Sequence, residues 1–154
     1  IEALAKEFDL FNQIENQKLI PISQEIALCQ THLEIMKYRK EINYSWQEEG
    51  IDLEQKVPPA ILHTLLENGI THSVPLEDNS IKFKLVFESN SHYKRYTFLT
   101  FAATVRQATS REDGTGLKYI KARLTESYHS NWDFTSEPTN HGWKNTIKIY
   151  TIGA

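Results

Sequence analysis

The sequence predicts an α+β fold: a two-layer α/β sandwich in which one mixed or antiparallel sheet carries helices on one face. Two observations lead to it. Helix-like and strand-like apolar patterns follow one another in the order helix, helix, strand, helix, strand, strand, helix, strand, strand, without strict alternation. The 154 residues, 40% of them apolar, are enough for one domain with one packed core.

Two helices are expected before the first strand. The first has an apolar stripe that needs a partner, either this domain or a second copy of the chain. The stripe consists of Leu4, Phe8, Phe11 and Ile14. Residues 16–21 suggest a linker, and Ser23 is a plausible N-cap for the second helix. The apolar face of the second helix consists of Ile26, Cys29, Leu33 and Met36.

The middle of the chain predicts one strand and one helix. Ile42, Tyr44 and Trp46 alternate with polar residues, as in a half-buried strand. Pro58-Pro59 suits a helix start, because the first turn has no amide hydrogen bond to lose. Pro75 prevents that helix from continuing. Its apolar residues are Ile61, Leu62, Leu65, Leu66 and Ile70.

The second half predicts four strands and one more helix. Alternating apolar residues indicate a strand over 80–88, and 95–105 is a second run rich in β-branched and aromatic residues. The polar stretch 106–113 is expected to be a loop, before a helix that begins near Gly114. Two closing strands are expected around 132–134 and 143–150. The polar residues 136–142 between them are expected to form a hairpin connection.

Composition limits the classes of function. The net charge of −3 gives no support to a nucleic-acid partner, and no apolar run approaches the ~20 residues that span a bilayer. The single cysteine, Cys29, excludes an internal disulfide, and its apolar helix face favours a core position. The absence of an initial Met and of a signal peptide suggests a piece of a longer protein.

A short glycine motif, Gly114-Thr115-Gly116, lies between the polar loop and a helix start. Its backbone amides can approach an anion closely, and the helix N-terminus adds free N–H groups and a positive dipole end. Thr115 adds a hydroxyl donor, and Lys118 adds a cation one turn into the helix. The alternative is a tight turn that only leads into a helix, since short glycine motifs are common.

Polar residues also gather at the end of the helix that follows the two prolines. Asn68 and His72 are four residues apart and therefore share one helix face. The amide oxygen of Asn68 is a hard ligand suited to Mg²⁺, which completes its octahedron with phosphates and water. The alternative is a polar helix end that faces solvent. Together, the two motifs offer a metal ligand and a phosphate cradle, both of which a nucleoside triphosphate needs.

Roughly residues 20–152 resemble LytS-type sensor histidine kinases. The residues from Gln24 to Arg39 resemble the segment that leads into the ATP-binding domain of that family. Residues 57–72, which end in Glu67-Asn68-Gly69-Ile70-Thr71-His72, resemble its N box. Gly114-Thr115-Gly116-Leu117 resembles its G2 box.

The resemblance implies the GHKL, or Bergerat, ATPase fold and the binding of ATP with Mg²⁺. It implies that Asn68 holds Mg²⁺, that Glu67 orders a water or the metal shell, and that His72 lies beside the nucleotide. Residues 106–113 would form a short lid. The residues that the resemblance assigns to the phosphates are Gly114, Thr115, Gly116, Leu117 and Lys118.

The sequence departs from the family pattern in three places. No glycine occurs between Gly69 and Gly114, so the Asp-x-Gly-x-Gly motif, whose Asp reads the adenine amino group, is absent. Thr104 is the acceptor at the matching place, and a hydroxyl is a weaker acceptor than a carboxylate. Thr71 stands where the N box often has a basic residue. The phosphoacceptor motif Pro-His-Phe-x-x-Asn is absent, so the acceptor histidine lies outside this chain.

The resemblance implies that residues 21–154 are the ATP-binding catalytic domain of a two-component sensor histidine kinase. Residues 1–20 would be the end of the dimerisation and phosphoacceptor helix region with its linker. The implied partners are ATP, the phosphoacceptor domain and a response regulator, in a homodimeric, membrane-anchored sensor whose kinase domain is cytoplasmic. One alternative is a degenerate domain that serves as a non-catalytic dimerisation or regulatory module. Another is a protein-serine kinase of the same superfamily.

The other histidines have no metal-ligand spacing with cysteine or carboxylate partners. They are His32, His63, His92, His129 and His141. The sequence therefore predicts no histidine-based metal site.

Overall fold

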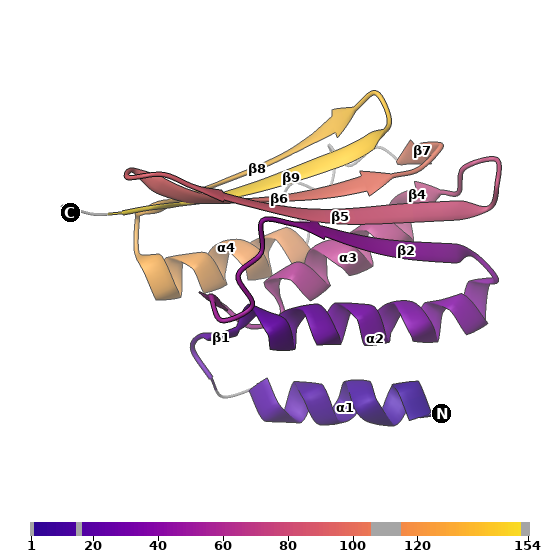
Figure 1. Cartoon of the computed structure of the whole chain (residues 1–154), viewed down its shortest axis with the longest axis horizontal. Helices are drawn as coiled ribbons and strands as arrows, with labels where there is room; N and C mark the ends of the chain where they lie inside the picture. Colours follow the sequence, from indigo (N-terminus) through magenta and orange to yellow (C-terminus); the bar gives the residue numbers. More distant parts are fainter. Residues whose placement is uncertain (1, 15–16, 106–114, 152–154) are drawn as a thin grey trace.

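A computed structural model describes residues 2–14, 17–105 and 115–151. Its main sheet has five strands in the order β2-β5-β6-β9-β8 (Figure 1). Strand β2 runs parallel to β5, and all other neighbours are antiparallel, so the sheet is mixed, as predicted. The five strands are β2 (Asn43–Glu49), β5 (Ser80–Ser89), β6 (Tyr93–Phe101), β8 (Trp132–Thr139) and β9 (Gly142–Tyr150).

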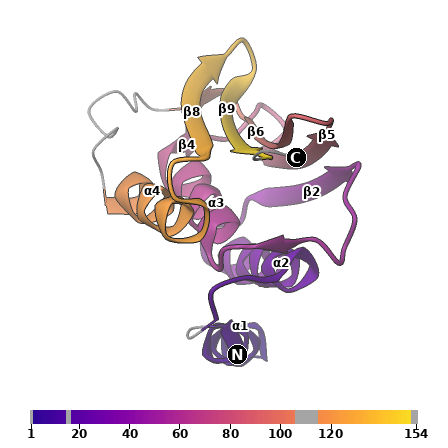
Figure 2. The same ribbon diagram turned by 90° about the vertical axis from the view of Figure 1, so that its left-hand side faces the viewer.

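Three helices cover one face of this sheet, and a fourth lies outside them (Figures 1 and 2). Helix α3 lies between α2 and α4, and α1 packs on the side of α2 that faces away from the sheet. The helices are α1 (Glu2–Ile14), α2 (Ile22–Lys40), α3 (Ile61–His72) and α4 (Thr115–Tyr128). The predicted order of helices and long strands is therefore confirmed.

Two short strand pairs fasten the connections. Strand β1 (Ile20–Pro21) pairs with β3 (Lys56–Val57), where the sequence predicted only a linker. Strand β4 (Ser73–Val74) directly follows α3 and pairs with β7 (Thr104–Val105). The predicted strand over 95–105 therefore consists of two pieces, β6 and β7. Two-residue pairings depend on a partner that is distant in sequence, so local periodicity gives no sign of them.

The start of α2 differs from the prediction. Ser23 is not its N-cap: the helix begins at Ile22, and Pro21 holds the cap position without a side-chain hydrogen bond. The Ile22 amide instead donates to the Gln55 carbonyl at 2.6 Å. The backbone beside β3 thus satisfies a helix-start amide that a capping side chain would otherwise have to bind.

The start of α3 is also stabilised by a residue that is distant in sequence, Glu25 of α2. The helix starts at Ile61, after both prolines, with Ala60 in the left-handed conformation at the N-cap. The carboxylate of Glu25, which is fully buried on α2, accepts hydrogen bonds from the amides of Ala60 (2.7 Å) and His63 (3.0 Å). Burial raises the pKa of Glu25, and the two amide hydrogen bonds oppose that rise. A side chain from α2 therefore caps α3.

The core lies between the sheet and the three helices. Ile81, Phe83 and Leu85 alternate on the helix-facing side of β5 and are fully buried, as the alternation predicted. Phe83 stacks on Phe98 of β6 with ring centroids 5.8 Å apart. The hairpin 136–142 is shorter than predicted, because β8 and β9 pair as far as Thr139 and Gly142.

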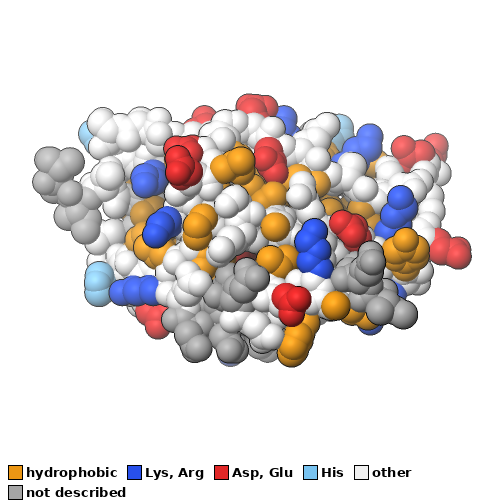
Figure 3. Space-filling view, turned by 60° about the horizontal axis from the view of Figure 1, so that its bottom comes forward, with side chains coloured by type: hydrophobic (Ala, Val, Ile, Leu, Met, Phe, Trp, Pro, Cys, Tyr) orange, Lys and Arg blue, Asp and Glu red, His pale blue; other side chains and the backbone are white. Residues whose placement is uncertain are grey.

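The stripe predicted for α1 faces solvent where the structure describes it. Leu4 is 52% exposed and Phe8 67%, whereas Leu10 packs against the core. Figure 3 shows this side of the molecule, with hydrophobic side chains among charged ones. The side chains of Phe11 and Ile14 lie outside the description. Among the residues that the structure describes, therefore, none covers the exposed part of the stripe.

Candidate functional site

The sequence-predicted motifs meet at the junction of α3 and α4. A Cβ atom added to Gly116 would lie 3.2 Å from Nδ2 and 3.3 Å from Oδ1 of Asn68. The amide of Asn68 therefore lies against the first turn of α4. The Cβ atom added to Gly116 would also lie 3.3 Å from the methyl group of Thr64, which is one turn before Asn68 on α3. Only a residue without a side chain leaves this contact undisturbed.

This contact has the chemistry that a magnesium-bound triphosphate needs. The first amides of α4 have no partners within the helix, and the dipole makes that end positive. Next to them lies the amide group of Asn68, which carries a neutral, hard oxygen of the kind that binds Mg²⁺. The residues present thus fit Mg²⁺ and phosphate: Asn68 could supply a metal ligand, and the start of α4 could supply amides to a phosphate.

The remaining predicted residues are distributed around this contact. Thr115 and Gly116 are the first residues of α4, Leu117 packs against the core, and Lys118 is exposed. Gly114 and the predicted lid over 106–113 lie outside the described residues.

Two further predicted residues lie near the end of α3. His72 is its last residue and is partly buried. Thr104 pairs with Val74 across β7 and β4, two residues beyond the end of α3. The backbone at Thr104 thus lies beside the segment that leaves the N-box helix; its side chain is outside the description.

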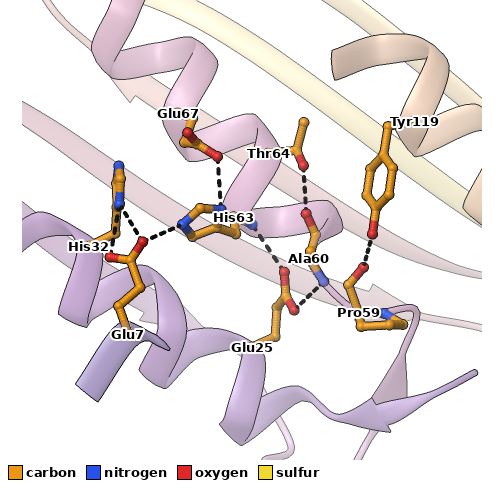
Figure 4. Close-up of polar contacts among 9 residues, drawn as sticks. All are labelled: Glu7, Glu25, His32, Pro59, Ala60, His63, Thr64, Glu67 and Tyr119. Carbon is orange, nitrogen blue, oxygen red and sulfur yellow. Dashed lines mark hydrogen bonds and ion pairs between the residues drawn. The ribbon is translucent and has the colours of Figure 1, made fainter. Parts of the chain in front are cut away.

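Glu67 lies on another side of α3 from Asn68, because consecutive helical residues point about 100° apart. Its carboxylate lies 3.0 Å from Nδ1 of His63, one turn earlier (Figure 4). The hydrogen bond from His63 lowers the pKa of Glu67, against the opposing effect of partial burial. Glu67 is therefore an ionised carboxylate held in place by His63, with about half of its side chain, 52%, open to solvent.

Sequence reasoning missed several residues that shape this region. Glu25 caps α3, and the hydroxyl of Tyr119 on α4 donates to the Pro59 carbonyl at 3.0 Å (Figure 4). The i, i+4 spacing of His63 and Glu67 was the one signal visible in the sequence. His32 and His63 also lie together with Glu7, although their spacing predicted no site. Their proximity depends on the packing of three helices.

A separate cavity of about 470 Å³ lies beyond the end of β6. It is lined by Leu76, Lys82, Phe101, Ala102, Ala103, Asn140 and His141. None of these residues belongs to the predicted site.

The sequence resembles a curated sensor protein. The sequence is 24% identical over 127 residues to the sensor protein LytS of Oceanobacillus iheyensis. The match covers 73% of this chain and 22% of that protein, so the chain spans about a fifth of its relative. No protein-family model matches the sequence.

Several solved structures match a larger share of this chain than the LytS sequence does. The catalytic domain of histidine kinase ThkA has a TM-score of 0.61 at 12% identity, covering 86% of this chain and 93% of that one. Histidine kinase AdeS of Acinetobacter baumannii has a TM-score of 0.63 at 14% identity, covering 97% and 78%. The histidine kinase domain of EL346 from Erythrobacter litoralis gives 0.61 at 15%, covering 96% and 71%.

The chain has the fold of a histidine kinase catalytic domain. The resemblance to LytS-type sensor kinases and the predicted α+β fold are both confirmed. In this histidine kinase fold, the N-box helix is the central one of the three that cover the sheet. Among the described residues, no helix combines the length and the apolar character needed to cross a membrane.

Proposed function

We propose that this chain is the ATP-binding catalytic domain of a two-component sensor histidine kinase. It transfers the γ-phosphoryl group of ATP to a histidine on a neighbouring domain. The contact between Asn68 and Gly116 carries the proposal, because it puts a magnesium-type ligand at a helix N-terminus. The histidine kinase fold and the likeness to LytS support it, and they favour it over a non-catalytic module.

The proposed roles follow the geometry. Asn68 holds the metal ion through its amide oxygen, and the first amides of α4, with Lys118, contact the phosphates. Bound Mg²⁺ supplies charge neutralisation on the phosphate oxygens. In the transfer, the bond between the γ-phosphorus and the β,γ-bridging oxygen breaks and a bond to an imidazole nitrogen forms, while ADP leaves. The amides of α4 stabilise charge that develops on the transferred group.

Three other residues complete the proposed site. Glu67, oriented by His63, orders a water at the edge of the metal shell. His72 lies beside the nucleotide, and Thr104 accepts a hydrogen bond from the adenine amino group. The pairing of β7 with β4 supports the role of Thr104, since it keeps that backbone next to the end of α3.

The partners and location of the whole protein belong to the same proposal. Residues 21–154 form the catalytic domain, and residues 1–20 are the end of the dimerisation region with its linker. The full-length protein is a membrane-anchored homodimer whose kinase domain is cytoplasmic and whose phosphoryl group passes to a response regulator. Exposed Leu4 and Phe8 on α1 support the homodimer, because they share one helix face that no described part of this chain covers.

Calorimetric titration of the chain with ATP, with and without Mg²⁺, tests the site. We expect binding that depends on Mg²⁺ and is strongly weakened, but still measurable, in Asn68→Ala, whereas Asn43→Ala, a change at an exposed position of β2, binds as the wild type does. Mg-ATP should also raise the melting temperature, because a ligand of the native state stabilises it. Absence of binding at millimolar nucleotide, or binding indifferent to Asn68→Ala, would refute the proposal in favour of the non-catalytic module.

A further inference from the structure

Glu7, His32 and His63 come from three different helices and converge on one point (Figure 4). Each offers one ligand atom, and the three atoms lie within 4.8 Å of one another. One carboxylate oxygen of Glu7 is 3.2 Å from Nδ1 of His32, and the other is 3.7 Å from Nε2 of His63. The two imidazole rings meet edge to face, with centroids 4.7 Å apart and planes inclined by 71°.

We propose that Glu7, His32 and His63 form a zinc-binding site that ties α1 to α2 and α3. Zinc at roughly 2.0–2.2 Å from its nitrogen and oxygen ligands holds those ligands about 3.3 Å apart in a tetrahedron. Two of the present separations, from Oε1 of Glu7 to Nδ1 of His32 (3.3 Å) and to Nε2 of His63 (3.7 Å), are already close to that value. Two histidines and one carboxylate are a known zinc ligand set, with water in the fourth position.

The surroundings of His63 favour metal binding. Its Nδ1 faces the carboxylate of Glu67 at 3.0 Å, which favours the tautomer with the proton on Nδ1. The Nε2 lone pair then points toward Glu7 and the proposed ion. A carboxylate behind a metal-binding histidine fixes the ring and raises its basicity. Glu67 thus acts as the outer partner of the site.

Burial and charge are also consistent with a bound cation. The side chains of His63, His32 and Glu7 are only 4%, 13% and 16% exposed. Two carboxylates, Glu7 and Glu67, and two neutral histidines balance the charge of one Zn²⁺. An ion here would join the N-terminal helix directly to the helix that carries the N box. The zinc ligands include neither Asn68 nor a residue of α4, and only Glu67, the outer partner, belongs to both proposed sites.

Titration of the chelator-treated chain with Zn²⁺ alone, followed by calorimetry, tests the proposal. We expect one equivalent to bind, and Co²⁺ to give the intense visible absorption of a tetrahedral site. His32→Gln and Glu7→Gln should each weaken zinc binding by at least about tenfold, and Glu67→Gln by about 10- to 100-fold. These positions are more accessible than His63, whose replacement could prevent folding.

His92→Gln and Glu54→Gln, both at exposed positions, are the matched controls and should bind zinc as the wild type does. Asn68→Ala should also leave zinc binding unchanged, which separates this site from the nucleotide site. If no zinc binds, the cluster is an ion-pair network only, and the proposal is wrong. Zinc binding that is equal in wild type, His32→Gln and Glu7→Gln would place the metal elsewhere and also overturn it.

Discussion

Gly116→Ala is the sharpest test of the contact between α3 and α4. The added methyl group would lie 3.2 and 3.3 Å from the two amide atoms of Asn68, which is shorter than an ordinary contact of 3.4–4 Å. The Asn68 amide must then shift by a few tenths of an ångström. A metal ligand tolerates little displacement, because its oxygen must stay at about 2.0–2.1 Å from Mg²⁺ in near-octahedral geometry.

We expect the affinity for Mg-ATP to fall by roughly tenfold, which corresponds to about 1.4 kcal/mol. The free energy of unfolding should not fall with it, because alanine is favoured over glycine in helices by up to about 1 kcal/mol. Calorimetry measures the affinity, and urea denaturation measures the stability. A binding loss without a stability loss would therefore report on the site itself.

A double-mutant cycle with Asn68→Ala completes the experiment. Once the Asn68 amide is removed, two of the three nearest atoms that the new methyl group crowds are gone and only the Thr64 methyl group at 3.3 Å remains, so Gly116→Ala should cost little further affinity. Lys121→Ala, an exposed change later in α4, is the control for altered helix propensity. If Gly116→Ala binds Mg-ATP as tightly as the wild type and folds normally, the reasoning about this contact is wrong.

Three other predictions concern the framework of the site. Glu25→Ala leaves two amides at the start of α3, the buried one of His63 and the partly buried one of Ala60, without their acceptor, and should lower the free energy of unfolding by about 1–3 kcal/mol in urea denaturation. Gly142→Ala puts a methyl group 1.8 Å from the Thr100 carbonyl at a φ of +154°, and should cost about 3 kcal/mol or more. The pKa of Glu67 is lowered by its hydrogen bond with His63, so its stabilising contribution is present above pH 4.5 and is lost as the pH falls through the lowered value. Glu67→Gln should therefore flatten the loss of stability in acid, measured by thermal denaturation across pH 2–5, while the exposed control Glu54→Gln should not.

The first two of these predictions need controls of their own. Gln24→Ala changes the neighbouring position of α2 without touching the amides at the start of α3, so it should keep most of the wild-type stability. Asn140→Ala, in the turn beside Gly142, is exposed and should also be nearly neutral. Unchanged stability of Glu25→Ala would show that water or another group caps α3. Unchanged stability of Gly142→Ala would show that β6 and β9 separate at little cost.

The sequence determined the helices and the five long strands of this fold, and it contains the two motifs of the proposed site. Alternation identified β5, and helical spacing identified α2, α3 and α4, because each of these elements buries one regular face. The N-box asparagine and the glycine motif were visible as local chemistry, and their contact was expected from their combination. The residues around Thr104 were less informative, since the adenine-reading motif of the family is absent there.

Only the tertiary structure decided how the helices begin and what gathers between them. Glu25 caps a helix that starts 36 positions further along the chain, and Gln55 rather than Ser23 meets the start of α2. Glu7, His32 and His63 form a cluster because three helices pack together, not because of any spacing between them. Local patterns reflect which face an element buries, whereas the partner that meets an amide, a carboxylate or an imidazole depends on packing between segments far apart in sequence.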